Sequence, residues 1–195
     1  MQLFAPGQEL TALLSAASTT DNESLTLTAA LSTANGGVYR VRVFGAQNTY
    51  SSGDNVRGLC TLDLNGDNYF DIVTANRSSG NITLFMNDGT GHFSSGFDIE
   101  TGTSSETACA PADINEDGLM DLFVGAYGSD EVVAMLSDGE GGLTAAEEID
   151  IGGVVWMLTA GDYNGDSHVD VVSVNSYSET FGVAFGDGEG GFMGV

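Results

Sequence analysis

Short apolar segments alternate with polar turns along most of the chain, and no segment has the length or periodicity of a helix. Asp-Gly turns that follow an apolar segment are typical of β-hairpins. We therefore expect repeats of four short strands. The expected ranges are 59–62, 108–112 and 157–161 for first strands, 71–75, 121–126 and 170–175 for second strands, 81–86, 131–136 and 180–185 for third strands, and 96–100 and 147–151 for fourth strands.

A nine-residue polar loop recurs between the first and second strand of each repeat. Its first residue is Asp63, Asp113 or Asp162, so the repeat is 50 and then 49 residues long. Asp88, Asp138 and Asp187 all lie 25 residues after that first Asp, in the Asp-Gly turn. Four strands in 40–50 residues are typical of a β-propeller blade, whereas a β-solenoid or a sandwich fits this period poorly.

The loops carry oxygen-bearing side chains at positions 1, 3, 5 and 9, and alternate side chains in a tight loop can turn toward one point. Carboxylate, amide and carbonyl oxygens are the ligands that Ca²⁺ prefers, and Mg²⁺ is second choice because it demands a stricter octahedron. The predicted side-chain ligands are Asp63, Asn65, Asp67 and Asp71, then Asp113, Asn115, Asp117 and Asp121, then Asp162, Asn164, Asp166 and Asp170, with the carbonyls of Tyr69, Leu119 and His168 at position 7.

Two other interpretations of these loops compete with a strand-linking calcium site. An EF-hand begins in the same way but needs a Glu at position 12 and a following helix. Position 12 is Thr74, Val124 or Ser173, and the next segment is apolar and β-branched, so the EF-hand is excluded. The other is a set of Asp/Asn/Gly turns that bind nothing. Three copies with the same ligand positions count against it.

The ends of the chain suggest how the repeats are organised. We expect one all-β domain of four blades, roughly 7–50, 51–100, 101–150 and 151–195, with the N-terminal strand in 1–6 completing the last blade. Segments 25–31 and 38–44 resemble strands, but the loop at 18–24 lacks the ligand pattern, so the first blade is expected to hold no metal. Two alternatives remain open: the chain is a piece of a larger propeller, or two chains form one eight-bladed ring. The choice between a monomer and a homodimer remains open as well.

Composition excludes several partners. The formal charge is −24, with four Arg and no Lys, so nucleic acid and anionic membrane surfaces are unsuitable partners. No apolar run is long enough to cross a membrane. Cys60 and Cys109 stand three and four residues before the first Asp of their repeats. That offset places them on opposite strand faces, so we interpret both as buried thiols rather than a disulfide.

The three loops, the segment 122–126 and the Asp-Gly-x-Gly ending of each repeat resemble the FG-GAP or VCBS-type repeats, the calcium-binding blades of integrin α head-like propellers and of many secreted bacterial proteins. The resemblance covers about residues 55–195 well. It implies Ca²⁺ at about three sites, a ligand surface on the face opposite the metal loops, and a location that is extracellular, at the cell surface or periplasmic.

The function we expect is a non-catalytic, calcium-stabilised binding, adhesion or scaffold module whose ligand is a carbohydrate or a protein. Near the turns of the opposite face stand Arg77, Tyr127, Trp156 and Tyr177. For Trp156 we favour a place in the core over a ligand contact. Two alternatives remain, a polysaccharide-acting enzyme domain and a minimal repeat protein without a ligand. The chain has two His and no visible Ser-His-Asp arrangement, which offers the enzyme little support.

Overall fold

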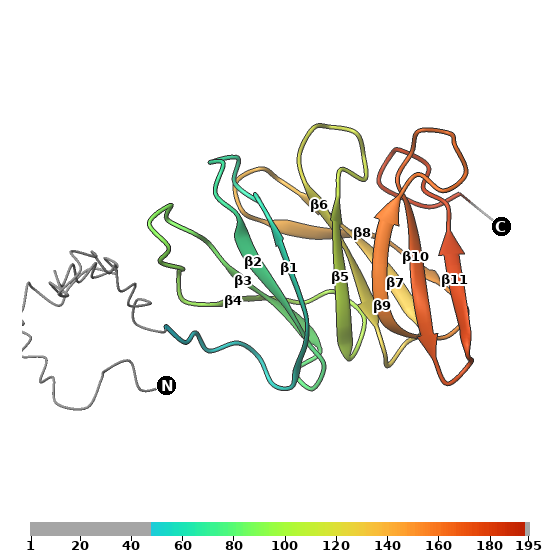
Figure 1. Ribbon diagram of the computed structural model, residues 1–195, viewed down its shortest axis with the longest axis horizontal. Coiled ribbons are helices and arrows are strands. Elements are labelled where there is room, and N and C mark those ends of the chain that lie inside the picture. Colours follow the sequence, from blue (N-terminus) through green and yellow to red (C-terminus); the bar gives the residue numbers. More distant parts are fainter. Residues whose placement is uncertain (1–47, 194–195) are drawn as a thin grey trace, which may run out of the picture. The chain divides into compact units, whose positions relative to one another are not determined.

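Three antiparallel sheets make up the part of the chain that the computed structural model describes, residues 48–193 (Figure 1). These residues contain no helix, so the all-β prediction is confirmed for them, and no membrane-crossing helix is found there. The first sheet consists of β1 (Val56–Leu62), β2 (Asp71–Asn76), β3 (Asn81–Phe85) and β4 (Phe97–Ile99), the second of β5 (Glu106–Ala112), β6 (Asp121–Ala126), β7 (Glu131–Ser137) and β8 (Leu143–Asp150), and the third of β9 (Val154–Gly161), β10 (Asp170–Ser176) and β11 (Thr180–Ala184).

Each sheet lies within one expected repeat, and most strands match their predicted ranges closely. The first strands begin two or three residues earlier than expected. The larger difference is β8, which begins at Leu143 rather than at 147, because Ser137 pairs with Leu143 directly across the Asp-Gly turn. The expected strands at 25–31 and 38–44, the metal-free first blade and the closing strand in 1–6 all lie outside the described residues.

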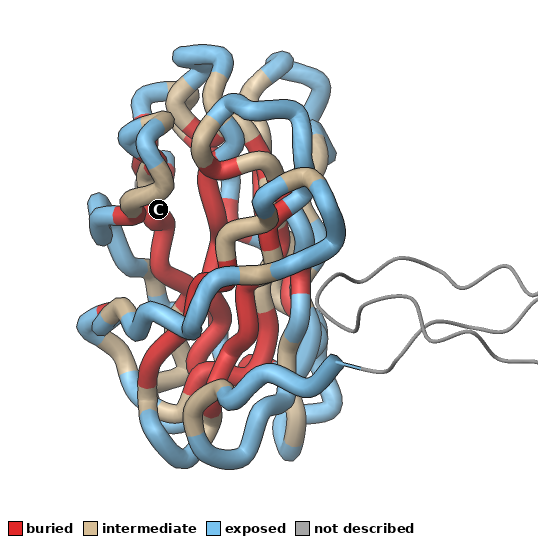
Figure 2. Tube along the Cα trace, turned by 90° about the vertical axis from the view of Figure 1, so that its left-hand side faces the viewer, coloured by how far each residue is buried: buried red, intermediate tan, exposed pale blue. Residues whose placement is uncertain are grey.

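The sheets pack face to face, with the first strands β1, β5 and β9 side by side (Figure 1). Two apolar layers separate them. Between the first and second sheets lie Leu62, Leu64, Val73, Ala75, Ile82, Leu84, Leu122, Val124, Val133 and Met135. Between the second and third lie Ala110, Ala112, Ile114, Phe123, Val132, Ala134, Val155, Val171, Ala184 and Phe192. The middle sheet is therefore buried on both faces, and Figure 2 shows the burial concentrated along the strands, away from the turns.

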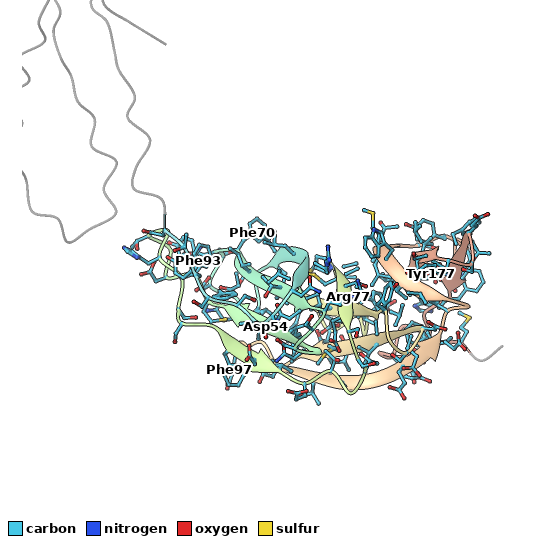
Figure 3. All side chains as sticks on the ribbon, turned by 90° about the horizontal axis from the view of Figure 1, so that it is seen from below. Asp54, Phe70, Arg77, Phe93, Phe97 and Tyr177 are labelled. Carbon is cyan, nitrogen blue, oxygen red and sulfur yellow. A yellow bond between two sulfur atoms is a disulfide. The ribbon has the colours of Figure 1, made fainter. Side chains whose placement is uncertain are left out.

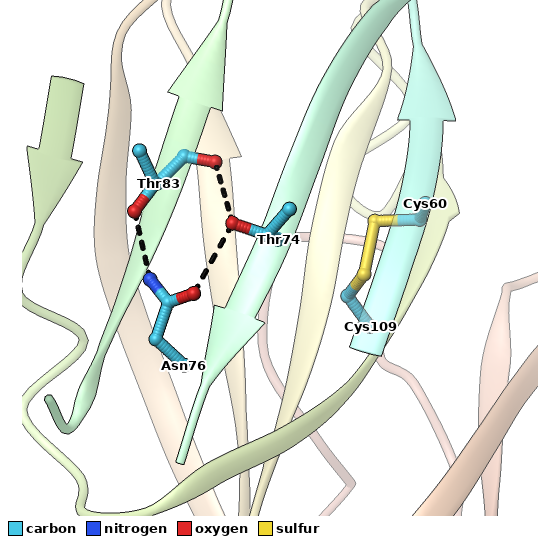
Figure 4. The surroundings of a disulfide bond; sticks show 5 residues. All are labelled: Cys60, Thr74, Asn76, Thr83 and Cys109. Atoms are coloured by element: carbon cyan, nitrogen blue, oxygen red, sulfur yellow. Dashed lines mark hydrogen bonds between the residues drawn. A yellow bond between two sulfur atoms is a disulfide. The ribbon is translucent and has the colours of Figure 1, made fainter. Parts of the chain in front are cut away.

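A disulfide links Cys60 on β1 to Cys109 on β5, with Cα atoms 6.1 Å apart (Figure 4). The prediction of two thiols was wrong. The two residues do point to opposite faces of their own sheets, since Cys60 pairs with Val73 and Cys109 with Val124. When two sheets stack, however, opposite faces of the repeat meet. The one-residue offset between the cysteines therefore points both of them into the layer between the first and second sheets.

A β-bulge interrupts the first strand of every sheet at the same place. The pairing skips Arg57 in β1, Thr107 in β5 and Trp156 in β9, each six residues before the first Asp of its loop. A bulge bends its strand and redirects the side chain of the extra residue. Next to the first bulge, Gly58 approaches β5 so closely that a Cβ there would lie 2.8 Å from the Thr107 carbonyl oxygen.

The outer face of the third sheet remains exposed. Several of its outward positions are apolar, and Met157, Val174 and Phe181, which lie opposite one another on neighbouring strands, are all exposed. This sheet has three strands where the other two have four. The described residues thus form three stacked blade-like sheets.

Candidate functional site

The three candidate metal loops lie at one end of the sheets, above the arrowheads of β1, β5 and β9 (Figure 1). Each loop has left-handed backbone at its fourth and sixth positions. In the first loop these are Gly66, with φ of 72°, and Asn68, with φ of 69°. The second loop has Glu116 and Gly118 there, and the third Gly165 and Ser167. Gly and Asn tolerate this region best, which explains their frequency in the loops.

The side chains at loop positions 3 and 5 are bonded to each other in the same way in all three loops. In the first, Asn65 Nδ2 donates to Asp67 Oδ2 at 3.0 Å and the Asp67 amide donates to Asn65 Oδ1 at 3.1 Å. Asp67 Oδ1 also accepts the Tyr69 amide at 2.8 Å. Asn115 with Asp117, and Asn164 with Asp166, repeat this arrangement. The loops are therefore held in a common, ordered conformation.

The aspartates at position 9 are fully buried and tie each loop to the next hairpin. Asp121 Oδ2 accepts the Ile114 amide at 2.9 Å and Oδ1 accepts the Ser137 amide at 2.8 Å. Asp71 and Asp170 make the equivalent pairs. Burial raises the pKa of the Asp121 carboxyl. The sequence pattern predicted these aspartates as metal ligands alone and did not predict their hydrogen bonds to backbone amides. The available signal was their constant separation of 16 residues from the amide at the end of the third strand.

Position 1 provides the test of whether the loops suit a cation. Both Asp63 oxygens accept loop amides, at 3.1 and 2.8 Å, and Asp162 does the same. In the second loop, Asp113 Oδ2 accepts the Gly118 amide, but Oδ1 is buried and has no hydrogen-bond partner. A buried carboxylate oxygen without a partner is costly, and a cation would offset that cost.

The donor set fits a hard cation, with carboxylate and amide oxygens at four positions of each loop. Within residues 48–193, however, no three carboxylate, imidazole or thiol groups converge closely enough to hold a metal by themselves. A bound cation would therefore also need the Asn oxygen and the backbone carbonyl at position 7, which belongs to Tyr69, Leu119 or His168. The structure brings the predicted ligands of each loop into one turn without bringing their carboxylates to one point.

One contact joins two of the loops. His168 Nδ1 of the third loop lies 2.6 Å from Glu116 Oε1 of the second. This hydrogen bond raises the pKa of the His168 imidazole above its ordinary value. The sequence pattern treated Glu116 as a spacer at position 4, and nothing local in the sequence indicates its contact with a residue 52 positions away.

At the opposite end of the sheets, the four predicted ligand residues come together. We call Arg77, Tyr127, Trp156 and Tyr177 the aromatic cluster. The Arg77 guanidinium carbon lies over the Tyr127 ring, 3.7 Å from its centroid. The Tyr127 ring meets Trp156 edge to face at 6.2 Å and Tyr177 at 6.1 Å between centroids. Figure 3 looks onto this end of the molecule and labels Arg77 and Tyr177.

Different elements supply these side chains. Arg77, Tyr127 and Tyr177 stand in or beside the turns between second and third strands, and Tyr177 has left-handed backbone with φ of 67°. Trp156 is the extra residue of the β9 bulge. Its side chain is 43% exposed, so the expectation that Trp156 fills the core was wrong. The bulge turns it out of the sheet-to-sheet interface.

Comparison with known families supports the repeat assignment. The family model of the FG-GAP-like repeat matches the chain twice, at residues 63–124 and 113–173. Each match begins at the first aspartate of a loop, and together they cover more than half of the 195 residues. None of the curated proteins compared with the chain matches it. The chain belongs to the FG-GAP-like repeat family.

Proposed function

We propose that this chain is a non-catalytic β-propeller module, stabilised by Ca²⁺, that binds a ligand through the aromatic cluster. The observation that carries the calcium assignment is the partnerless Asp113 Oδ1, buried in a loop whose ligand pattern occurs three times. Each loop carries three carboxylates in one turn, at positions 1, 5 and 9, and their like charges would repel one another if they converged without a cation. Bound Ca²⁺ would supply the neutralising charge that holds the first strand to the second.

We further propose that residues 1–47 complete a ring of four blades. The support is the exposed outer face of the third sheet, where Met157, Val174 and Phe181 form an apolar surface. Stacked blades bury such faces against one another, and exposed patches of this kind are uncommon in monomers. A closed four-bladed ring predicts a monomer by light scattering. A dimer would favour the eight-bladed arrangement of two chains.

The proposed location is outside the cytoplasm, at the cell surface or in the periplasm. The Cys60–Cys109 disulfide supports it, because such bonds persist in oxidising compartments. Calcium loops support it as well, since extracellular calcium modules bind at about 10⁻⁴–10⁻³ M, the concentration range found outside cells. For the tests below, the protein is purified without reductant so that the disulfide stays intact.

The test of the calcium assignment is the melting temperature in excess Ca²⁺ and in EDTA. At a free Ca²⁺ concentration 100 times the Kd, each site adds about 2.7 kcal/mol to the free energy of unfolding. Asp113→Asn should remove one of three sites and so reduce the calcium-induced stabilisation by about a third. Isothermal titration calorimetry should count three sites in the wild type and two in the variant.

The matched control is Glu148→Gln, which also removes one negative charge but changes an exposed residue within β8, outside all three loops. It should leave the calcium response unchanged. A second control replaces CaCl₂ by NaCl of equal ionic strength, because screening alone stabilises a chain of charge −24. Equal melting temperatures in Ca²⁺, in NaCl and in EDTA would refute the calcium assignment.

A further inference from the structure

We propose that the aromatic cluster recognises a carboxylated sugar, the uronate unit of an acidic polysaccharide. Arg77 would bind the carboxylate, and the exposed rings of Trp156 and Tyr177 would pack on the sugar. This inference rests on the proposed role as a binding module, but not on the presence of calcium. Three features of the cluster carry it.

The first feature is the placement of the Arg77 guanidinium. It lies over the Tyr127 ring at 3.7 Å, which fixes its position through a cation–π contact. A guanidinium that lies over a ring face still has its N–H donors free around the edge of the guanidinium plane. Two of these donors can form parallel hydrogen bonds to the two oxygens of a carboxylate. The group is therefore ordered before any ligand arrives.

The second feature is that Arg77 has no carboxylate counter-ion among the described residues. The chain has 28 acidic residues and four Arg, yet within residues 48–193 the sole ion pair joins Glu116 and His168. Arg57 and Arg77 are the two arginines of this part of the chain. They lie at the same end, since the Arg77 amide donates to the Asn55 carbonyl at 3.2 Å, two residues before Arg57. Among residues 48–193 neither arginine is paired with a carboxylate, although Asp54 and Glu179 stand in or beside turns at the same end.

The third feature is the exposed aromatic surface beside Arg77. Tyr177 is 82% exposed and Trp156 is 43% exposed. Their ring planes are inclined at 68° and 64° to Tyr127, so neither ring stacks face to face on it. Amphipathic rings with one open side suit ligands that combine apolar faces with hydroxyl groups, as sugars do. Tyr177 is held in a left-handed backbone conformation that favours Gly, Asn or Asp, an unusual place for an exposed aromatic residue.

Among anionic ligands, these features favour a uronate. Duplex nucleic acid carries one phosphate charge per about 1.7 Å of its length, so a protein of charge −24 repels it more strongly than a short uronate oligomer with one carboxylate per sugar. An acidic peptide offers a carboxylate but no rigid ring to cover two aromatic side chains. A uronate combines one carboxylate with one rigid ring, which matches one guanidinium beside aromatic faces.

Trp156 makes the test direct, because it is the only Trp in the chain and its fluorescence reports on the cluster alone. The wild-type protein is titrated with tri-galacturonate and with neutral galactotriose at one fixed Ca²⁺ concentration. The expected result is a saturable change in Trp156 fluorescence with tri-galacturonate, at a Kd at least about tenfold below that for galactotriose.

Two variants separate the charge from the aromatic contact. Arg77→Gln should weaken tri-galacturonate binding at least about tenfold and leave galactotriose unchanged. Tyr177→Ala should weaken binding of both sugars. Phe97→Ala is the matched control, because Phe97 is similarly exposed on β4, at the edge of the first sheet (Figure 3), and should change neither. Circular dichroism verifies that each variant is folded.

Three outcomes would overturn the inference. One is equal affinity for the charged and neutral sugars, and another is equal affinity in wild type and Arg77→Gln. The third is equally tight binding of tri-glutamate, which would assign the cluster to acidic peptides. A failure of the calcium proposal would show instead in the melting curves with EDTA, which do not depend on Trp156, so the two results are distinguishable.

Discussion

Cys60 and Cys109 form a disulfide between the first strands of two adjacent sheets, although they occupy different positions in successive repeats. Cys60 faces the second sheet and Cys109 faces the first, so the bond crosses the apolar layer between them. It joins residues 49 positions apart and thus closes one full repeat. The contact between the first two sheets therefore has a covalent link that the contact between the second and third lacks.

We expect removal of this bond to lower the free energy of unfolding by about 2–4 kcal/mol, because the reduced unfolded chain gains conformational freedom. The measurement is urea unfolding of the wild type with and without dithiothreitol. The Cys60→Ala/Cys109→Ala double variant should match the reduced wild type approximately and should not respond to dithiothreitol. A wild type whose unfolding ignores the reductant would contradict the prediction.

Gly58 is predicted to reject any side chain. A Cβ there would lie 2.8 Å from the Thr107 carbonyl oxygen and 3.0 Å from the Ala108 Cα, both backbone atoms of β5. Overpacking against backbone forces neighbouring strands apart, so Gly58→Ala should cost about 1–3 kcal/mol in urea unfolding. Gly161→Ala is the control, since its nearest neighbour would be a Tyr163 ring atom at 3.6 Å, an ordinary contact. Equal stability of the two variants would show that β1 and β5 are not this close.

Asp121→Asn should destabilise the second sheet even in EDTA. Both carboxylate oxygens accept backbone amides, from Ile114 and Ser137, and the residue is fully buried. An Asn amide group would face one of these N–H donors with its own N–H, which leaves buried donors unpaired at a cost of about 1–3 kcal/mol. Urea unfolding in EDTA measures the effect with no metal contribution. Glu148→Gln is again the control, and a loss of stability seen only in Ca²⁺ would assign Asp121 to the metal alone.

Acid should weaken the Asp-Gly turns, because each turn aspartate accepts hydrogen bonds within its turn. The pKa of Asp88 is lowered mainly by the Thr90 hydroxyl, that of Asp138 by the Gly142 amide and that of Asp187 by the Glu189 amide. A lowered pKa in the folded state means that the stabilisation is present above the unfolded value, about 3.9, and is lost as the pH falls through the folded value.

The measurement is a carboxyl NMR titration combined with unfolding curves between neutral and acidic pH. The triple variant Asp88→Asn/Asp138→Asn/Asp187→Asn should show a shallower loss of stability below about pH 4 than the wild type does. Glu148→Gln should retain the wild-type slope. Folded-state pKa values at or above the ordinary Asp value would contradict the prediction.

Several features were readable from local sequence. The Asp-x-Asn-x-Asp loops and the Asp-Gly turns at fixed spacing identified the repeat and its strands, because a turn depends on a few adjacent residues. The grouping of Arg77, Tyr127 and Tyr177 at one end followed from their equivalent turn positions. Glu116 was not readable, because its partner His168 lies in another repeat and approaches only when the sheets stack.

The sequence by itself determined the repeat, the all-β architecture and the candidate ligand positions, since each depends on short-range pattern and turn chemistry. Tertiary structure alone decided that Cys60 meets Cys109 and that Trp156 points outward. Both outcomes depend on which faces two sheets bring together and on a bulge that shifts the register of one strand. The residues next to Cys60 in the sequence do not show which surface of the neighbouring sheet it will face. The residues next to Trp156 do not show that a bulge will turn its side chain outward.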